Sequence, residues 1–177
     1  RELSWAYQGR EITFYLPGMF RLNGHTGQYP AMSITGSECA LKCDHCQGKI
    51  LSSMIAADSP DSLVDRCRAL EEKGRLGVLI SGGCLEDGSM PWTDFLSAIE
   101  TVKKTTRLYV SVHCGLVDDD MALGLKEAGA DQALIDVIGD DETFQTIYHV
   151  PFGVARIESA MASLEDAGLP MIPHIVC

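Results

Sequence analysis

Apolar runs alternate with segments of helical periodicity along most of the chain. Continuous apolar stretches are typical of parallel strands that are covered on both faces, and we expect strands at residues 29–35, 77–81, 108–113, 132–137 and 171–176. Between them, apolar positions recur every three or four residues, which predicts helices at residues 59–73, 91–104, 118–127 and 154–167. Five strands that alternate with helices indicate about five parallel βα units joined by right-handed crossovers.

Polar residues mark where several of these helices begin. Ser59 precedes Pro60 at the start of one helix, where proline is favoured at the first helical position. Two acidic runs, at residues 118–120 and 140–142, resemble metal-binding clusters. Each run also opens a helix, and carboxylates there complement the helix dipole. We therefore interpret both runs as helix caps.

The first 28 residues follow a different pattern. They predict a short helix at residues 1–8, a strand at 11–16, and turns at Pro17-Gly18 and Asn23-Gly24. We interpret residues 1–28 as a leader that flanks a barrel at residues 29–177. A complete eight-fold βα barrel takes about 250 residues, so this α/β protein is expected to form a partial parallel (β/α) barrel. We expect native residues to be missing at both ends, with the barrel truncated at its C-terminus.

Composition narrows the class of protein. The 177-residue chain is 46% hydrophobic and carries a net charge of −11, which argues against nucleic acid as a partner because phosphate binding needs clustered Lys and Arg. No apolar run approaches the roughly 20 residues of a membrane span. An odd set of seven unevenly spaced cysteines fits a reducing cytoplasm and metal chemistry better than disulfides.

Three of the cysteines carry the strongest chemical signal. Cys39, Cys43 and Cys46 have the spacing C-x3-C-x2-C in the loop after the first expected strand. Three thiolates on one loop leave one iron of a cubic four-iron cluster without a protein ligand. Zinc is the second candidate, since a structural zinc site would need a fourth protein ligand and His45 is too close for the usual paired spacing. Three structural thiols remain the third interpretation.

This motif, followed by alternating helices and strands, resembles the radical S-adenosylmethionine (radical SAM) superfamily. The resemblance implies a partial barrel of radical SAM type in which Cys39, Cys43 and Cys46 bind a 4Fe-4S cluster. In that family the open iron binds the amino and carboxylate groups of S-adenosylmethionine. The reduced cluster then breaks the sulfonium bond to release a 5′-deoxyadenosyl radical, with electrons from a protein such as ferredoxin or flavodoxin. His45 fills a position that is commonly aromatic in the family.

The resemblance assigns further cofactor-binding residues. Gly82 and Gly83 match the first two residues of the family's Gly-Gly-Glu segment, which holds the methionine amino group, but Cys84 replaces the glutamate. Asp136 matches a strand-end aspartate that binds ribose hydroxyls in biotin synthase. The simpler alternatives are a tight glycine turn and a carboxylate that caps the next loop.

Two more residues are candidates on weaker grounds. Ile175, with Val176, lies on the fifth expected strand, whose apolar residues pack on adenine in the family. His113 ends the third expected strand and lines the pocket if it faces inward. A core position is an equal alternative for His113 and the more common one for Ile175 and Val176. His149 and His174 have no partner that the sequence identifies, and no residue of the chain is assigned a catalytic role of its own.

The remaining cysteines leave a second cluster open, although they do not match the second-cluster cysteines of biotin synthase residue by residue. Three of them follow the second, third and fifth expected strands, which places them at the carboxyl ends of the barrel strands: Cys84, Cys114 and Cys177. Cys67 lies on an apolar helix face and is expected in the core. Three segments, the first strand with the cysteine loop and residues 112–118 and 134–141, resemble biotin-synthase-like proteins, and among them the split, two-protein lipoyl synthases. This resemblance implies sulfur insertion into an octanoyl chain, with a second radical SAM protein and an acylated carrier protein or peptide as partners.

Two other functions stay open from the sequence. One is radical SAM chemistry on another small molecule in cofactor biosynthesis. The other is a non-catalytic partner subunit that binds a cluster or zinc.

Overall fold

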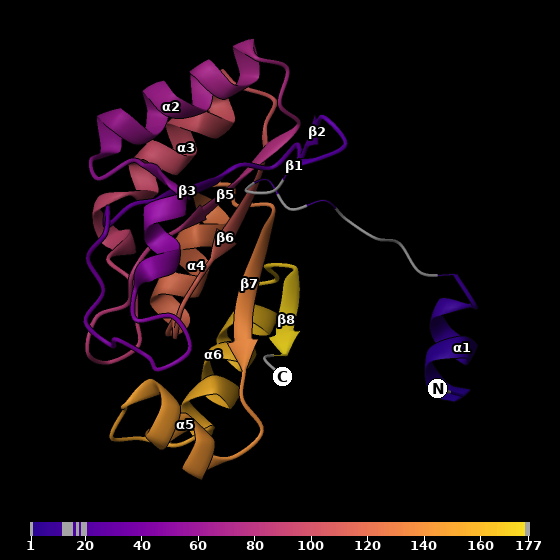
Figure 1. Cartoon of the computed structure of the whole chain (residues 1–177), viewed down its shortest axis with the longest axis vertical. Coiled ribbons are helices and arrows are strands. Elements are labelled where there is room, and N and C mark those ends of the chain that lie inside the picture. The colour runs from indigo at the N-terminus through magenta and orange to yellow at the C-terminus, as the bar shows by residue number, and fades with distance from the viewer. Residues whose placement is uncertain (1, 12–15, 17, 19–20, 176–177) are drawn as a thin grey trace.

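A curved parallel sheet organises the molecule in the computed structural model, which describes residues 2–11, 16, 18 and 21–175. Its six strands run in the order β4-β3-β5-β6-β7-β8, and every neighbouring pair is parallel. Their bounds are β3 Ala31–Ser33, β4 Ile55–Ala56, β5 Gly77–Ser81, β6 Tyr109–His113, β7 Gln132–Val137 and β8 Met171–Ile175. Helices lie along one face of the sheet (Figure 1). The expected partial parallel (β/α) barrel is confirmed.

Five helices follow the strands. Their bounds are α2 Pro60–Glu72, α3 Leu96–Thr105, α4 Asp119–Glu127, α5 Asp141–Tyr148 and α6 Ala155–Asp166. The side chains of Ser59, Asp118 and Asp140 accept hydrogen bonds from backbone N–H groups in the first turns of α2, α4 and α5. These bonds satisfy amide groups that a helix start leaves unpaired. Both acidic runs are therefore helix caps, as expected.

Two elements differ from the sequence-based expectation. The helix expected from residue 91 begins as a separate 3₁₀ turn, η2 Trp92–Asp94, before α3. The turn lets the fully buried Trp92 indole donate a 2.9 Å hydrogen bond to the carbonyl oxygen of Cys114. The sheet also has one strand more than the five expected. Strand β4 has only two residues, too few to show a periodic pattern, and pairs beside β3.

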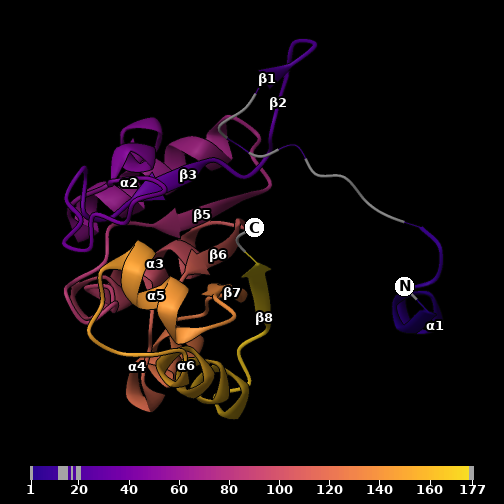
Figure 2. The ribbon, with the colours of Figure 1, turned by 60° about the horizontal axis from the view of Figure 1, so that its bottom comes forward.

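The first 30 residues include α1 Glu2–Gln8 and a two-stranded hairpin, β1 Arg21–Leu22 and β2 His25–Thr26. Asn23 and Gly24 form the hairpin turn, both with positive φ, as the sequence predicted. The strand expected at residues 11–16 falls mostly outside the described residues. Helix α1 lies apart from the sheet (Figures 1 and 2). The boundary between leader and barrel stays a prediction.

The two faces of the sheet differ in polarity. Residues that face the helices are apolar and almost fully buried, and include Val78, Ile80, Val110, Val112 and Ile135. Residues that alternate with them on the concave face are largely polar: Ser33, Ser81, Ser111, His113, Gln132 and Asp136. This pattern leaves the concave face suited to a polar ligand. Within the described part of the chain, no helix is both long and apolar enough to cross a membrane.

Candidate cluster and cofactor site

The cysteine loop lies at the carboxyl end of β3, on the rim where the strand-to-helix loops gather. Cys43 is buried, while Cys39 and Cys46 are partly exposed, and all three are free thiols. The backbone N–H groups of Cys46 and Gln47 both donate to the Cys43 carbonyl oxygen, at 3.2 and 2.7 Å. These bonds form a compact turn that keeps Cys43 and Cys46 together.

The glycine pair after β5 packs directly against this loop. The Gly83 N–H donates a 2.7 Å hydrogen bond to the hydroxyl of Thr35, which in turn donates to the carbonyl oxygen of Glu38 at 2.8 Å. A side chain on Gly83 would overlap the Glu38 carbonyl and bring its Cβ to 2.6 Å from Cys39 Cα. Glycine at residue 83 is thus required by close contact between two loops, and not by a positive φ. Its N–H already has a partner.

The end of α5 supports the same loop from another side. The backbone N–H of Asp44 donates to the Ile147 carbonyl oxygen at 2.9 Å, and His149 Nε2 lies 2.7 Å from Asp44 Oδ1. The rings of His45 and Tyr148 lie 4.9 Å apart. No local sequence pattern indicates these contacts, since they join positions about 105 residues apart. His149, for which no partner was identified, is therefore part of the support for the cysteine loop.

Asp136 is the centre of a second polar group on the rim. His113 Nε2 lies 3.1 Å and His174 Nδ1 lies 3.7 Å from Asp136 Oδ1. Burial acts to raise the pKa of Asp136, but the hydrogen bond with His113 and the charges of His113 and His174 hold it below its usual value. Burial, and then His113, lower the pKa of His174. Asp136 is therefore a carboxylate near neutral pH.

The spacing of the ligand atoms bears on the choice between a cluster and a single ion. Among the residues that the structure describes, His113, Asp136 and His174 form a group of three whose ligand atoms lie within 4.8 Å of one another, and the motif cysteines do not form one. Sulfur atoms bound to one tetrahedral zinc at 2.3 Å lie only about 3.8 Å apart. Cys39, Cys43 and Cys46 therefore do not converge into a single-zinc arrangement in this structure.

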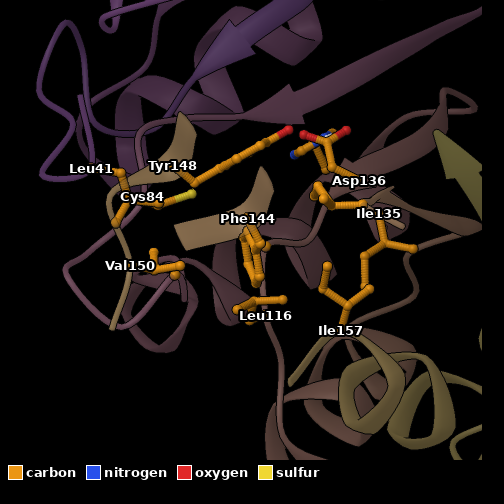
Figure 3. Close-up of a pocket in the computed structure, with 13 residues that line it drawn as sticks. Leu41, Cys84, Leu116, Ile135, Asp136, Phe144, Tyr148, Val150 and Ile157 are labelled. Carbon is orange, nitrogen blue, oxygen red and sulfur yellow. Dashed lines mark hydrogen bonds and ion pairs between the residues drawn. The ribbon is translucent and has the colours of Figure 1, made fainter. Parts of the chain in front are cut away.

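A largely apolar pocket opens beside the cysteine loop, beneath α5 (Figure 3). Its apolar lining includes Leu41, Leu116, Ile138, Phe144, Val150 and Ile157. Cys84, His113, Asp136 and Tyr148 add polar atoms. Burial raises the pKa of Tyr148 to about 12, with further contributions from Asp136, Cys43, Cys46 and Cys84. The phenol therefore keeps its proton at neutral pH and is a hydrogen-bond donor in the pocket.

Two further candidates, Cys84 and Ile175, lie at different places on the rim. Cys84 lies close to the motif cysteines, and its carbonyl oxygen accepts a hydrogen bond from the Ala40 N–H at 2.8 Å. Burial, then the neighbouring Cys39 and Cys43, raise the pKa of Cys84 to about 12. Ile175 is 75% exposed at the end of β8, so no core packing accounts for it.

The second-cluster hypothesis gains no support from Cys114. This residue is fully buried, and its thiol lies 3.4 Å from the Leu134 carbonyl oxygen. Cys177 falls outside the described residues. Cys67 is fully buried on α2, as expected for a core cysteine.

These features define a class of protein: a parallel βα barrel whose carboxyl rim holds a three-cysteine loop of cluster type beside a strand-end carboxylate. A family model described as the radical SAM superfamily matches residues 33–176. The chain belongs to the radical SAM superfamily.

Solved structures with a similar fold include methylornithine synthase (PylB), with a TM-score of 0.62 and 17% sequence identity. The match covers 83% of this chain and 44% of that one, so the chain spans less than half the length of PylB. An uncharacterised protein has a TM-score of 0.45 and 14% identity, over 82% of this chain and 46% of that one. No curated protein matches the chain.

Proposed function

We propose that this chain is a radical SAM enzyme that reductively cleaves S-adenosylmethionine and abstracts hydrogen from a small substrate. The observation that carries the proposal is the position of the cysteine loop. It packs on Gly83 at the carboxyl rim of the barrel, beside Asp136 and an apolar pocket. Family membership supports the same chemistry.

Several features of the site fit a 4Fe-4S cluster and S-adenosylmethionine. The three loop thiols are free, and in the described structure they do not form a compact three-ligand group. When bound, the cluster and S-adenosylmethionine together supply the electron and the carbon radical that hydrogen abstraction requires. Cys39, Cys43 and Cys46 would hold the cluster, leaving one iron without a protein ligand.

The rest of the rim orients the cofactor and excludes water. Asp136, kept ionised beside two histidines, would accept hydrogen bonds from ribose hydroxyls. Gly83 fixes the cysteine loop against the end of β5, and Gly82 lies against the side chains of Ile34, Thr35 and Met90. The apolar lining beneath α5 offers a dry place for the substrate, which protects a reactive radical from side reactions.

Reduction under anaerobic conditions tests the proposal. Protein purified without oxygen should contain iron and sulfide, and with a strong reductant it should convert S-adenosylmethionine to methionine and 5′-deoxyadenosine. A ferredoxin or flavodoxin is the expected natural electron donor. Zinc in place of iron, or an iron-loaded protein that releases no deoxyadenosine, would contradict the proposal and favour a non-catalytic partner subunit.

For the substrate we propose an aliphatic chain, with an octanoyl group as the specific candidate, as in the split lipoyl synthases. The apolar pocket supports an aliphatic group. A sacrificial second cluster as sulfur source has less support, because Cys114 is fully buried. Radical chemistry on a different small molecule is the alternative, and the fold of PylB, by its name a methylornithine synthase, is compatible with it.

A further inference from the structure

The hydroxyl of Tyr148 is a buried polar atom that lacks a hydrogen-bond partner among the described residues. Tyr148 as a whole is only 8% exposed. Most buried polar groups in proteins are hydrogen-bonded, and an exception calls for an explanation. A ligand bound in the pocket would explain the unpaired hydroxyl, because Tyr148 lines the pocket beside the cysteine loop.

The orientation of the Tyr148 ring is fixed by its neighbours. The ring centre lies 5.3 Å from that of Phe144 in an edge-on arrangement and 4.9 Å from that of His45. Phe144 is itself 3% exposed, so the aromatic contacts leave little room for another rotamer. Figure 3 shows the ring reaching from α5 across the pocket, with its hydroxyl at the end that faces Asp136.

Tyr148 and Asp136 face one another as a donor and an acceptor that do not bond directly. Asp136 Oδ1 is occupied by His113 at 3.1 Å, and no hydrogen bond joins the carboxylate to the phenol within the described residues. An ionised carboxylate only accepts hydrogen bonds, whereas a protonated phenol donates one. A group that satisfies both must donate and accept, and an alcohol does so. Two adjacent alcohols would satisfy both partners at once.

We propose that Tyr148 is a cofactor-binding residue whose hydroxyl donates to a ribose hydroxyl of S-adenosylmethionine, opposite Asp136. The inference rests on the proposed function, because it requires that S-adenosylmethionine bind at this rim. Its chemistry is recognition of a vicinal diol by a phenol and a carboxylate. A hydroxyl of the substrate has the same chemistry, and the choice of ligand in the experiment separates the two sources.

Tyr148→Phe is the informative variant, because it removes the hydroxyl and keeps the ring that packs on His45 and Phe144. Binding of S-adenosylmethionine and of its 2′-deoxy and 3′-deoxy analogues is measured on anaerobically reconstituted protein, with no substrate present. We expect about fivefold weaker binding of S-adenosylmethionine, as for one lost hydrogen bond. At least one of the two analogues should bind wild type and variant equally, because it lacks the hydroxyl that Tyr148 contacts.

Tyr109→Phe is the matched control. The Tyr109 hydroxyl donates to Gln132 Oε1 at 3.1 Å. This contact lies where β6 and β7 begin, at the opposite end of these strands from His113 and Asp136, so its removal should leave the affinity for S-adenosylmethionine unchanged. Iron content and the absorption spectrum of each variant should equal those of the wild type, which shows that the cluster is intact.

Two results would overturn the inference. Equal affinity of wild type and Tyr148→Phe for S-adenosylmethionine would show that the hydroxyl does not contact the cofactor and leave a substrate hydroxyl as its partner. An equal loss for the natural cofactor and both analogues would show that it acts elsewhere than on the ribose. In either case, deoxyadenosine release by the wild type would leave the proposed function intact. A wild-type protein that binds no S-adenosylmethionine would instead refute the proposed function.

Discussion

The residue that most constrains the site is a glycine. Gly83 contributes no side chain, yet the backbone of the cysteine loop occupies the space where its Cβ would lie. The Thr35 hydroxyl bridges the two segments by accepting from Gly83 and donating to Glu38. The position of the motif cysteines therefore depends on the lack of a side chain at residue 83.

Gly83→Ala should displace the cysteine loop. The new methyl group would overlap the Glu38 carbonyl, which is backbone and cannot swing away, and overpacking of this kind costs about 1–3 kcal/mol. We expect a lower melting temperature and a reduced iron content after anaerobic reconstitution. Gly139→Ala is the control, because nothing lies within 4 Å of its added Cβ. Full iron content in Gly83→Ala would show that the loop does not need this contact.

Cys39→Ala, Cys43→Ala and Cys46→Ala should each lose the cluster. Two remaining thiolates do not retain a four-iron cluster well, since the usual protein-bound cluster has three or four. Iron and sulfide analysis with absorption spectroscopy measures the loss. Cys67→Ala, in the core of α2, should keep the iron while lowering stability. If all three motif variants keep full iron, the ligand assignment is wrong.

Asp136→Ala should weaken binding of S-adenosylmethionine. Each ribose hydrogen bond lost is worth about 1 kcal/mol net, or roughly fivefold in affinity. Equilibrium binding to the reconstituted protein measures this change. An unchanged affinity would mean that Asp136 serves only to pair with His113 and His174.

At the scale of elements, α5 and the cysteine loop form one structural unit. The C-terminal end of the helix holds Asp44 through the Ile147 carbonyl and the His149 ring, and it holds His45 through Tyr148. Asp44 and His45 lie between the second and third motif cysteines. Any shift of α5 therefore moves the candidate cluster ligands as well.

Phe144→Ala should destabilise the contact between α5 and the cysteine loop more than removal of the His149–Asp44 contact does. Phe144 is 3% exposed, and truncation of a buried phenylalanine costs about 3–5 kcal/mol. His149→Asn removes a half-exposed side-chain contact with Asp44 worth about 0–1 kcal/mol, and asparagine tolerates the left-handed conformation at this position. Chemical denaturation measures both changes, and hydrogen exchange at residues 43–47 measures loop mobility. Equal losses in the two variants would contradict this ranking.

Local signals predicted the elements better than the contacts between them. Helix caps at Ser59, Asp118 and Asp140 depend on neighbouring residues, so the sequence was sufficient to place them. The two-residue strand β4 and the turn at Trp92 have no periodic pattern of their own. The partners of His149 and His174 depend on tertiary packing, which no local spacing encodes.

For the whole molecule, the sheet separates two environments. Its convex side is sealed by helices over a continuous apolar core, while its concave side carries serine, histidine and carboxylate side chains. The alternation of side chains along each strand produces this division. The chain covers 44% of PylB, so substrate and partner remain proposals for the protein as a whole.

The split lipoyl synthase hypothesis makes a prediction at this scale. An octanoyl-lysine peptide incubated with this protein, a second radical SAM protein, reductant and S-adenosylmethionine should gain sulfur. The sulfur would come from an iron–sulfur cluster of one of the two proteins, whose sulfide bonds to the carbon radical while one of its irons is reduced. The physical reason is that an unactivated C–H bond requires a radical, and the apolar pocket suits an acyl chain. Mass spectrometry of the peptide detects the product. Deoxyadenosine release with an unchanged peptide would exclude this substrate and leave only the broader activity.

The Trp92 indole is buried and hydrogen-bonded to the Cys114 carbonyl at the end of β6, so it is an intrinsic fluorescence probe of this region. Its fluorescence should be shifted to the blue, as for an indole shielded from water, and sensitive to repacking where β6 meets the rim. The only other tryptophan, Trp5, lies in α1, away from the sheet. A Trp5→Phe background would therefore give a single-tryptophan protein in which cofactor binding is followed by emission, without any label.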